Sequence, residues 1–238
     1  MMKLSPIRLN NSEPVSRQIF NHLKKQIVEI KVSPGTRLSE NELSSIFNVS
    51  RQPVREALFL LKQVGLIEVF PQKGSYVTKI SAKNLKETCF LRSSVECSAV
   101  FEGIKNKDEE RFNAIIEDMK DNLALQRRLL EKPNDNDRDG RFLELDDAFH
   151  HLICRLSGTN LAWEVIESYK SNIDRIRFLS TQRVSSMPKL VEEHTEICRL
   201  IEKEQALDAT QKLHEHLYEI TKTWGPILEQ NAECFEKN

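Results

Sequence analysis

The chain lacks the features that mark secreted or membrane proteins. Its five cysteines are odd in number and none forms a C-x-x-C pair, so reduced thiols in a cytoplasmic protein are the plain interpretation. No stretch approaches the roughly 18 apolar residues that a membrane span needs. No apolar run follows Lys3, as it would in a signal peptide. We therefore expect a cytoplasmic protein with no membrane partner.

The net charge of −1 conceals an uneven distribution along the 238 residues. Residues 1–80 hold 12 Lys+Arg against 6 Asp+Glu, a net of +6, whereas the remainder holds 23 against 30, a net of −7. The basic N-terminal segment suits a domain that binds a polyanion, and the acidic remainder suits a domain with a different function. The length allows two modest domains with a proper core.

A helix-turn-helix is indicated by the stretch 48–58. Ser50 is a suitable N-cap and Pro53 falls in the first turn, where its missing N–H costs nothing. Arg51 and Arg55 are four residues apart, on a face that the apolar stripe does not occupy, and guanidinium groups suit phosphates and guanine edges. Ordinary solvated charges remain the alternative for the two arginines. The apolar stripe consists of Val54, Ala57, Leu58 and Leu61.

The flanking sequence favours the DNA-binding interpretation. An amphipathic helix over about 15–30 precedes a turn at Pro34-Gly35, beside which Arg37 could meet a phosphate or be merely solvated. Ser39 to Glu42 form a capping box that opens the next helix. Gly65 ends the recognition helix, and strands over 66–70 and 75–78 form a hairpin. The order predicts a winged helix-turn-helix over residues 1–80.

No strand pattern follows residue 80, so an all-helical bundle is expected after a short linker over 81–84. The bundle should occupy 85–238 and contain a polar loop over 133–140. The run Asp174-Arg175-Ile176-Arg177 is expected to be a solvated helix face, with added positive charge for a pocket as the alternative. Helices are expected from 85 to about 99 and over about 109–130, 141–156, 160–181, 187–202 and from 206 past 218.

One Asp and several His in the bundle could bind a divalent transition metal. Asp146 and His150 share a helix face, and His194 and His216 lie on later helices. Imidazole and carboxylate suit zinc, nickel, copper, iron or manganese, so residue type does not choose among them. Surface or core histidines are the alternative. The pair Asp147 and His151 has the same spacing, and His214 competes with His216, so periodicity does not fix the register.

Residues 15–80 resemble the DNA-binding domain of the GntR family of transcription factors. In that family the residues that match Arg37, Arg51 and Arg55 contact DNA, and the wing glycine that matches Gly74 lies in the minor groove. The resemblance also implies that Ser50, Gln52 and Lys73 approach DNA. It is carried by Pro34-Gly35-x-Arg37-Leu38-Ser39-Glu40, Val49-Ser50-Arg51-x-Pro53-Val54-Arg55-Glu56-Ala57-Leu58, Gly65-Leu66-Ile67 and Gly74-Ser75-Tyr76-Val77.

The second half resembles the FCD-type effector domain of the FadR branch of this family, through Leu145-Asp146-x-x-Phe149-His150-x-x-Ile153 and Ser157-Gly158-x-Asn160. The resemblance implies that Asp146, His150, His194 and His216 bind a metal, for which we take zinc first and nickel, manganese or iron as alternatives. It also implies that Arg92 contacts a small carboxylate effector of sugar-acid type. A surface ion pair with Glu96 is the alternative role for Arg92.

These observations predict a homodimeric, metabolite-responsive transcriptional regulator, most simply a repressor, that binds a short palindromic operator in double-stranded DNA. The alternative is a metal-dependent enzyme in the bundle. Against the enzyme stands the absence of an H-E-x-x-H motif or a placed general base, because His214-Glu215-His216 has the wrong spacing. We therefore expect no catalytic residues.

Overall fold

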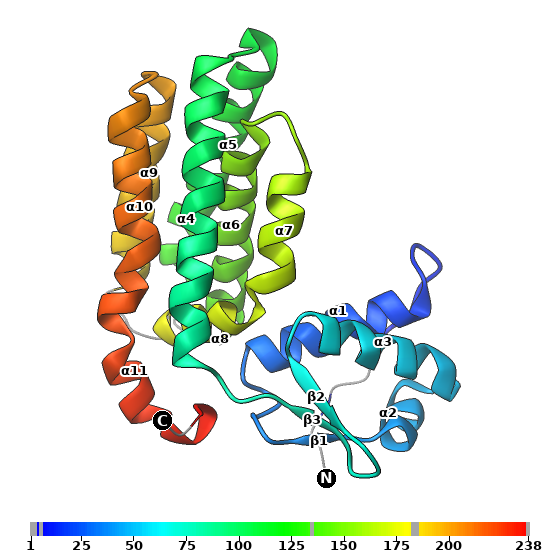
Figure 1. Cartoon of the computed structure of the whole chain (residues 1–238). Coiled ribbons are helices and arrows are strands. Elements are labelled where there is room, and N and C mark those ends of the chain that lie inside the picture. Colours follow the sequence, from blue (N-terminus) through cyan, green and yellow to red (C-terminus); the bar gives the residue numbers. More distant parts are fainter. Residues whose placement is uncertain (1–3, 5–6, 134–135, 182–185, 237–238) are drawn as a thin grey trace.

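The computed structural model describes residues 4, 7–133, 136–181 and 186–236. A small domain with a sheet lies beside a tall helical bundle, and one connection joins them (Figure 1). The small domain contains α1 (Val15–Val28), β1 (Arg37–Leu38), α2 (Glu40–Phe47), α3 (Arg51–Gln63), β2 (Ile67–Phe70) and β3 (Gly74–Val77). The bundle side contains α4 (Ala82–Lys105), α5 (Glu109–Leu130), α6 (Asn136–Arg155), α7 (Leu161–Tyr169), α8 (Ser171–Thr181), α9 (Ser186–Glu202), α10 (Ala206–Thr223), α11 (Gly225–Gln230) and a 3₁₀ turn (Ala232–Cys234).

The small domain is a winged helix-turn-helix, as predicted. Its apolar stripe on α3 is buried against α1 and α2, around Ile19, Leu23 and Leu43. The Ser39 half of the predicted capping box is present, because the Ser39 side chain accepts a hydrogen bond from the Glu42 amide. Gly65 follows α3 with a φ of +72°, the left-handed conformation that suits glycine.

Two local features of this domain differ from the sequence prediction. Arg37 follows the predicted turn at Pro34-Gly35, but it lies in a strand that the sequence prediction lacked, because β1 pairs antiparallel with β3 and gives the sheet the order β1-β3-β2. A two-residue strand is too short to leave a periodic pattern. Ser50 occupies the N-cap position of α3 but its side chain makes no capping hydrogen bond, so the predicted cap interaction is absent.

The bundle is built from five long helices, α4, α5, α6, α9 and α10, which stand roughly side by side (Figure 1). Their core contains Val100, Phe112, Met119, Phe149 and Ile197, all 5% exposed or less. After β3, the described residues contain helices, turns and one isolated bridge between Ile80 and Phe235. The mainly helical fold class is therefore confirmed. No helix in the described part of the chain is both long and apolar enough to cross a membrane.

Three boundaries in the bundle were predicted wrongly. Helix α4 begins at Ala82, so most of the expected linker 81–84 is its first turn. Of the expected loop 133–140, positions 134 and 135 lie outside the described residues, and α6 is helical from Asn136 onward. The expected helix 160–181 is broken at Lys170, where the chain turns and α8 crosses the base of the bundle (Figure 1).

The two domains are packed against each other. Helix α1 lies against α8, and Val28, Leu143 and Phe178 form an apolar contact across the junction. Ion pairs flank this contact: Lys25 pairs with Glu144 at 2.6 Å, and Lys24 pairs with Glu167. Helix α8 therefore contacts both the DNA-binding domain and the rest of the bundle.

Candidate functional site

Three imidazoles converge inside the bundle. His150 on α6, His194 on α9 and His216 on α10 are each at most 8% exposed. The Nε2 atom of His216 lies 3.2 Å from Nε2 of His194 and 3.3 Å from Nε2 of His150. The three nitrogens are thus close enough to bind one metal ion together.

Each ring is oriented by an oxygen acceptor at its other nitrogen. A carboxylate accepts but cannot donate, so the Nδ1 atoms facing Glu96 and Glu193 carry the proton. Gln126 also acts as an acceptor toward His194. Its amide nitrogen donates to Asn122 at 2.7 Å, so its amide oxygen faces the ring. These contacts are His150 Nδ1 to Glu96 Oε2 at 2.6 Å, His216 Nδ1 to Glu193 Oε2 at 2.7 Å and His194 Nδ1 to Gln126 Oε1 at 2.9 Å.

This hydrogen-bond pattern fits a metal ion. A neutral ring protonated at Nδ1 presents an Nε2 lone pair, and here three such lone pairs face one another. Burial lowers the pKa of His194 well below its usual value and also lowers that of His150, so both rings stay neutral. Neutral imidazoles whose second nitrogen donates to a carboxylate or amide oxygen are the usual arrangement around zinc and related ions.

Asp146 completes the group from the same helix as His150. Its Oδ2 lies 3.7 Å from Nε2 of His150 and its Oδ1 lies 3.5 Å from Nε2 of His194. Burial opposes ionisation, but the Arg177 guanidinium, which pairs with Oδ2, lowers the pKa of Asp146. The carboxylate is therefore charged and available to a cation, in competition with Arg177.

The structure resolves the register that the sequence left open. Asp147, next along α6, pairs with Lys170 and Arg177 instead of the imidazoles. His151 stacks on Trp163 with ring centroids 5.3 Å apart. His214 contacts the Ser93 hydroxyl at 2.8 Å through Nδ1. The four residues predicted as ligands are thus brought together and their competitors are placed elsewhere.

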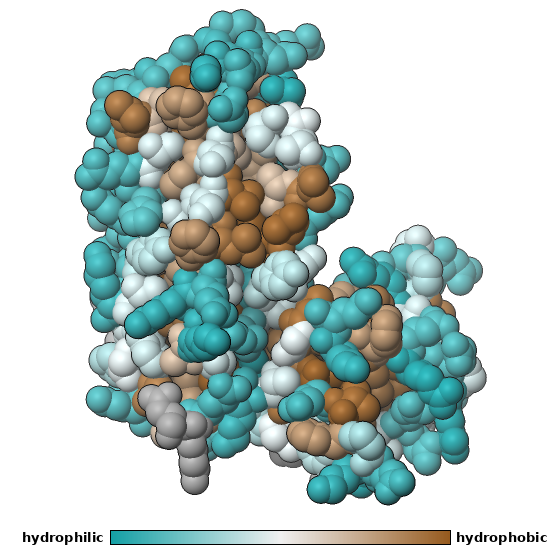
Figure 2. Space-filling model, in the orientation of Figure 1, coloured by the Kyte–Doolittle hydropathy of each residue, from teal (hydrophilic) through white to brown (hydrophobic). Residues whose placement is uncertain are grey.

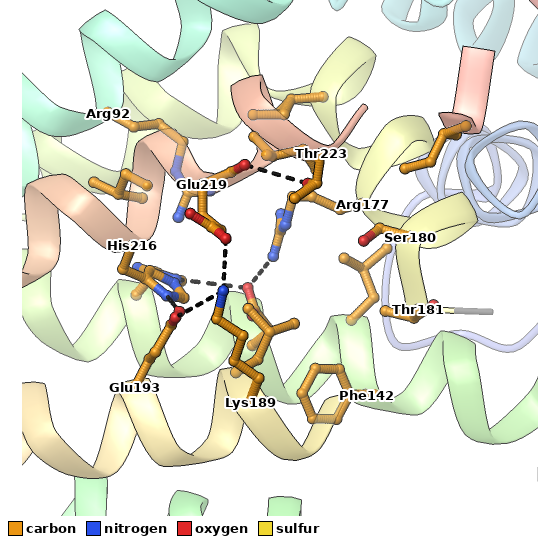
Figure 3. A pocket seen from close by; sticks show the side chains of 18 residues that line it. Arg92, Phe142, Arg177, Ser180, Thr181, Lys189, Glu193, His216, Glu219 and Thr223 are labelled. Carbon is orange, nitrogen blue, oxygen red and sulfur yellow. Dashed lines mark hydrogen bonds and ion pairs between the residues drawn. The ribbon is translucent and has the colours of Figure 1, made fainter. Parts of the chain in front are cut away.

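A cavity of about 280 Å³ adjoins the imidazoles (Figure 3). Arg92 lines it and is 3% exposed; its Nε donates to Glu96 at 2.8 Å, while its Nη2 is buried without a hydrogen-bond partner among the described residues. The ion pair with Glu96 therefore exists, but it is buried rather than on the surface. Arg92 thus combines an ion pair with a donor that remains available to a ligand.

Polar groups and apolar walls share the rest of the cavity. Figure 3 shows Lys189 between Glu193 and Glu219, at 3.8 Å and 2.6 Å respectively. Arg177 lies on another wall, and hydroxyl groups and apolar side chains fill the remainder. The hydroxyls come from Ser180, Thr181 and Thr223, and the apolar walls include Phe142, Leu190 and Ile220.

Several residues that support the site were missed in the sequence. Glu193 directly precedes His194 in the motif Glu193-His194-x-x-Ile197, and Gln126 lies on α5, but the sequence prediction gave neither residue a role at the site. The run at 174–177 was expected to be solvated, but Asp174, Arg175 and Arg177 are at most 9% exposed. Among these supporting residues, only Glu96 was indicated by the sequence, because its four-residue spacing from Arg92 predicted the ion pair.

The recognition helix presents its predicted residues to solvent. Arg51, Gln52 and Arg55 are exposed. Arg55 forms a paired contact with Glu40, with Nε to Oε1 at 3.1 Å and Nη2 to Oε2 at 3.0 Å. Gln52 donates to Glu56 at 2.9 Å. Glu40 therefore competes with a phosphate for Nε and Nη2 of Arg55, while the remaining guanidinium N–H groups take no part in this paired contact.

The wing places Arg37 against Gly74. A Cβ on Gly74 would lie 3.2 Å from Arg37 Nε, and the φ of Gly74 is +105°, so a side chain there is disfavoured on both counts. Lys73 is exposed in the turn and its amide donates to Phe70 at 3.1 Å. The strand pairing of β1 with β3 thus brings an arginine to the wing.

The fold and the site together describe a winged-helix protein whose second domain encloses a cavity lined by charged, hydroxyl and apolar side chains. Residues 15–77 match the family described as bacterial regulatory proteins, gntR family, and residues 87–219 match the FCD domain. The chain belongs to the GntR family of transcriptional regulators and carries an FCD domain. This family consists of regulators, not enzymes, so the enzyme alternative is set aside.

Whole-length relatives support the assignment. The HTH-type transcriptional repressor RspR of Escherichia coli is 36% identical over 230 residues, which cover 97% of each chain. The gluconate operon transcriptional repressor of Bacillus subtilis is 25% identical over 224 residues, 91% of this chain and 88% of that one. The solved structure of E. coli McbR/YncC has a TM-score of 0.70 at 19% identity, covering 92% of this chain and all of the other, which shows a shared fold.

Proposed function

We propose that this chain is a cytoplasmic, homodimeric repressor whose operator binding responds to a small carboxylate held beside a metal ion. The observation that carries the proposal is the convergence of three Nε2 atoms whose Nδ1–H groups are all engaged by acceptors. Such a set does not stabilise an apolar core, because burying unpaired Nε2 lone pairs is costly. The same lone pairs attract a cation.

His150, His194 and His216 would hold the metal through Nε2, with Asp146 as the oxygen ligand. Three nitrogens and one oxygen suit zinc, and nickel, manganese and iron bind the same atom types. When bound, the ion supplies a positive charge that attracts a carboxylate oxygen. Glu96, Glu193 and Gln126 hold the rings in position for it.

Arg92 would contact the other part of the effector carboxylate through the Nη2 group that lacks a partner. A cavity of about 280 Å³ suits a small metabolite. The hydroxyls of Ser180, Thr181 and Thr223, together with Glu219, can bind the hydroxyl groups of a sugar acid. The name of the gluconate operon relative, which refers to a sugar acid, adds support for this effector class.

The DNA-binding unit would comprise residues 1–80 and the receptor unit residues 85–238, with the predicted linker 81–84 largely absorbed into the first turn of α4. Two recognition helices in a dimer would bind the half-sites of a short palindrome. The residues that we assign to operator contacts are Arg37, Ser50, Arg51, Gln52, Arg55, Lys73 and Gly74; the exposure of the three polar side chains on α3 supports this.

A second copy of the chain would cover an apolar face of the bundle. Figure 2 shows hydrophobic side chains gathered over the bundle on this side. Phe90 and Phe101 on α4 and Leu161 and Tyr169 on α7 are 41–66% exposed, and the two helices are in contact. Exposed patches of this kind mark interfaces. Sedimentation of Phe101→Glu should show monomers if this face joins the protomers.

Elemental analysis of the purified protein tests the metal site. We expect about one equivalent of metal per chain, lost in Asp146→Ala and His150→Ala. His151→Ala is the matched control, because this ring stacks on Trp163 away from the cluster. Equal metal content in all variants would reject the site. A reporter gene behind a selected operator then tests repression, which should be relieved by sugar acids.

A further inference from the structure

An arginine of α8 donates hydrogen bonds to the connection between the domains, the segment from Thr78 to Ser81. Arg175, which is 0% exposed, donates from Nη1 to the Thr78 carbonyl at 2.6 Å and from Nη2 to the Thr78 hydroxyl at 3.3 Å. The Thr78 hydroxyl in turn donates to the carbonyl of Gly65 at 2.8 Å. Gly65 follows the recognition helix α3, so two consecutive hydrogen bonds link α8 to the end of that helix.

The end of the chain holds the same connection from another side. The Ile80 amide donates to the Cys234 carbonyl at 2.9 Å, and the Glu236 amide donates to the Ile80 carbonyl at 3.0 Å. Ile80 and Phe235 are buried together with Ile173 and Ile176 of α8. Helix α8, the connection and the C-terminal segment are therefore one packed unit.

The chemistry of Arg175 is unusual for a purely structural residue. Its hydrogen-bond partners are neutral oxygens, and no carboxylate lies within ion-pair distance of it among the described residues. Burial lowers its pKa to about 10, because buried surroundings disfavour the charged form. An apolar side chain would fill such a place at lower cost, so a role in positioning the connection explains the arginine better.

The opposite side of α8 contacts the receptor site. Arg177, two residues along, pairs with Asp146, with Asp147 at 2.8 Å and with Asp174 at 2.6 Å. Successive α-helical residues are 100° apart, so Arg175 and Arg177 project to nearly opposite sides. Helix α8 thus has the proposed metal ligand on one side and the inter-domain connection on the other.

We propose that α8 transmits the state of the receptor site to the recognition helix through Arg175 and Thr78. This inference rests on the proposed function of the site. A cation bound beside Asp146 would share its carboxylate with Arg177, which pairs with Oδ2 while Oδ1 faces His194, and its charge would repel the guanidinium. Arg177 therefore has different interactions in the two states, which is the free-energy difference that a conformational shift requires.

Hydrogen–deuterium exchange of the full-length protein, with Zn²⁺ or with a chelator, tests the inference without knowledge of the effector or the operator. In the wild type, Zn²⁺ should slow exchange around 146–150. It should also change the exchange rates over 64–81 by roughly twofold to thirtyfold, the usual span for coupled residues. Arg175→Met and Thr78→Val should keep the first response and lose the second, and Arg175→Lys should restore part of it.

Thr210→Val is the matched control, because it removes a threonine hydroxyl that bonds within α10, far from the connection. It should respond as the wild type does. Thr78→Val is nearly isosteric and keeps the test decisive if Arg175→Met fails to fold. A response at 146–150 with none at 64–81 in the wild type, or wild-type responses in both variants, would overturn the inference and leave the metal site standing. No response at 146–150 would overturn the metal site and the inference with it.

Discussion

Replacing Glu193 by glutamine is expected to weaken Zn²⁺ binding without removing any metal ligand. Glu193 Oε2 accepts the Nδ1 proton of His216 at 2.7 Å and thereby fixes the ring so that Nε2 faces the other imidazoles. The substitution keeps the size of the side chain but removes its charge. A neutral amide acceptor makes the imidazole a weaker base than a carboxylate does. The glutamine side chain can also present its NH₂ group instead of its oxygen to Nδ1, which would no longer orient the ring.

The expected loss is about 10- to 100-fold in affinity, the range found when the residue that orients a metal-bound histidine is altered. A tenfold change corresponds to about 1.4 kcal/mol, so the loss is about 1.4–2.8 kcal/mol. Glu193 is only partly buried and also faces Lys189 at 3.8 Å, which places the effect toward the lower end of this range.

Competition with a chromophoric chelator of known affinity at pH 7.5 measures the Zn²⁺ affinity directly. Glu192→Gln is the matched control, because this neighbouring glutamate is exposed and the substitution changes the net charge by the same amount. Circular dichroism should show the same helix content in both variants. Equal Zn²⁺ affinities in Glu193→Gln and Glu192→Gln would refute the assignment of Glu193 as an orienting residue.

Three further substitutions test the DNA-binding domain and the packing of the bundle. Arg51→Ala should lose about 1–3 kcal/mol of binding to a duplex selected from random sequence, measured by fluorescence anisotropy, whereas exposed Arg8→Ala should not. Glu40→Gln frees Arg55 from its paired contact and should tighten binding to nonspecific duplex at low salt, an effect that fades as salt rises; a result equal to that of Glu13→Gln would contradict this. Gly103→Ala places a Cβ 2.6 Å from the Cβ of Leu156 and should cost about 1–3 kcal/mol in urea unfolding, more than helix propensity returns, whereas Gly225→Ala, with nothing within 4 Å, should not.

The fold of the DNA-binding domain was predictable because its signals are local. The stripe on α3, the Ser39 capping box and Gly65 each act over a few residues, and each is present in the structure. Helix boundaries in the bundle were predicted less well. The break at Lys170 depends on a side chain that is 1% exposed and bonded to Asp147 on another helix, and no local pattern reports such a contact.

The convergence of the four proposed ligands required more than spacing. Only Asp146 and His150 are tied by the geometry of one helix, whereas His194 and His216 reach the same point through the packing of α9 against α5 and of α10 against α4 and α9. The family resemblance pointed to these four residues, and in the structure their side chains lie close together. The orienting groups Glu96, Glu193 and Gln126 escaped prediction because isolated glutamates and glutamines are ordinary on helix surfaces.

The most consequential error of the sequence prediction concerns α8. The run Asp174-Arg175-Ile176-Arg177 was expected to be a solvated helix face, with added positive charge for a pocket as the alternative. Burying a single charge in a core is costly. Here the cost is offset collectively, since Arg177 contacts three aspartates and Lys170 contacts two. Such a network is stable only while every member keeps its partner. Under the proposed coupling, a cation bound at Asp146 changes the balance of these contacts on α8, and α8 is also the helix that holds the connection to the recognition helix through Arg175.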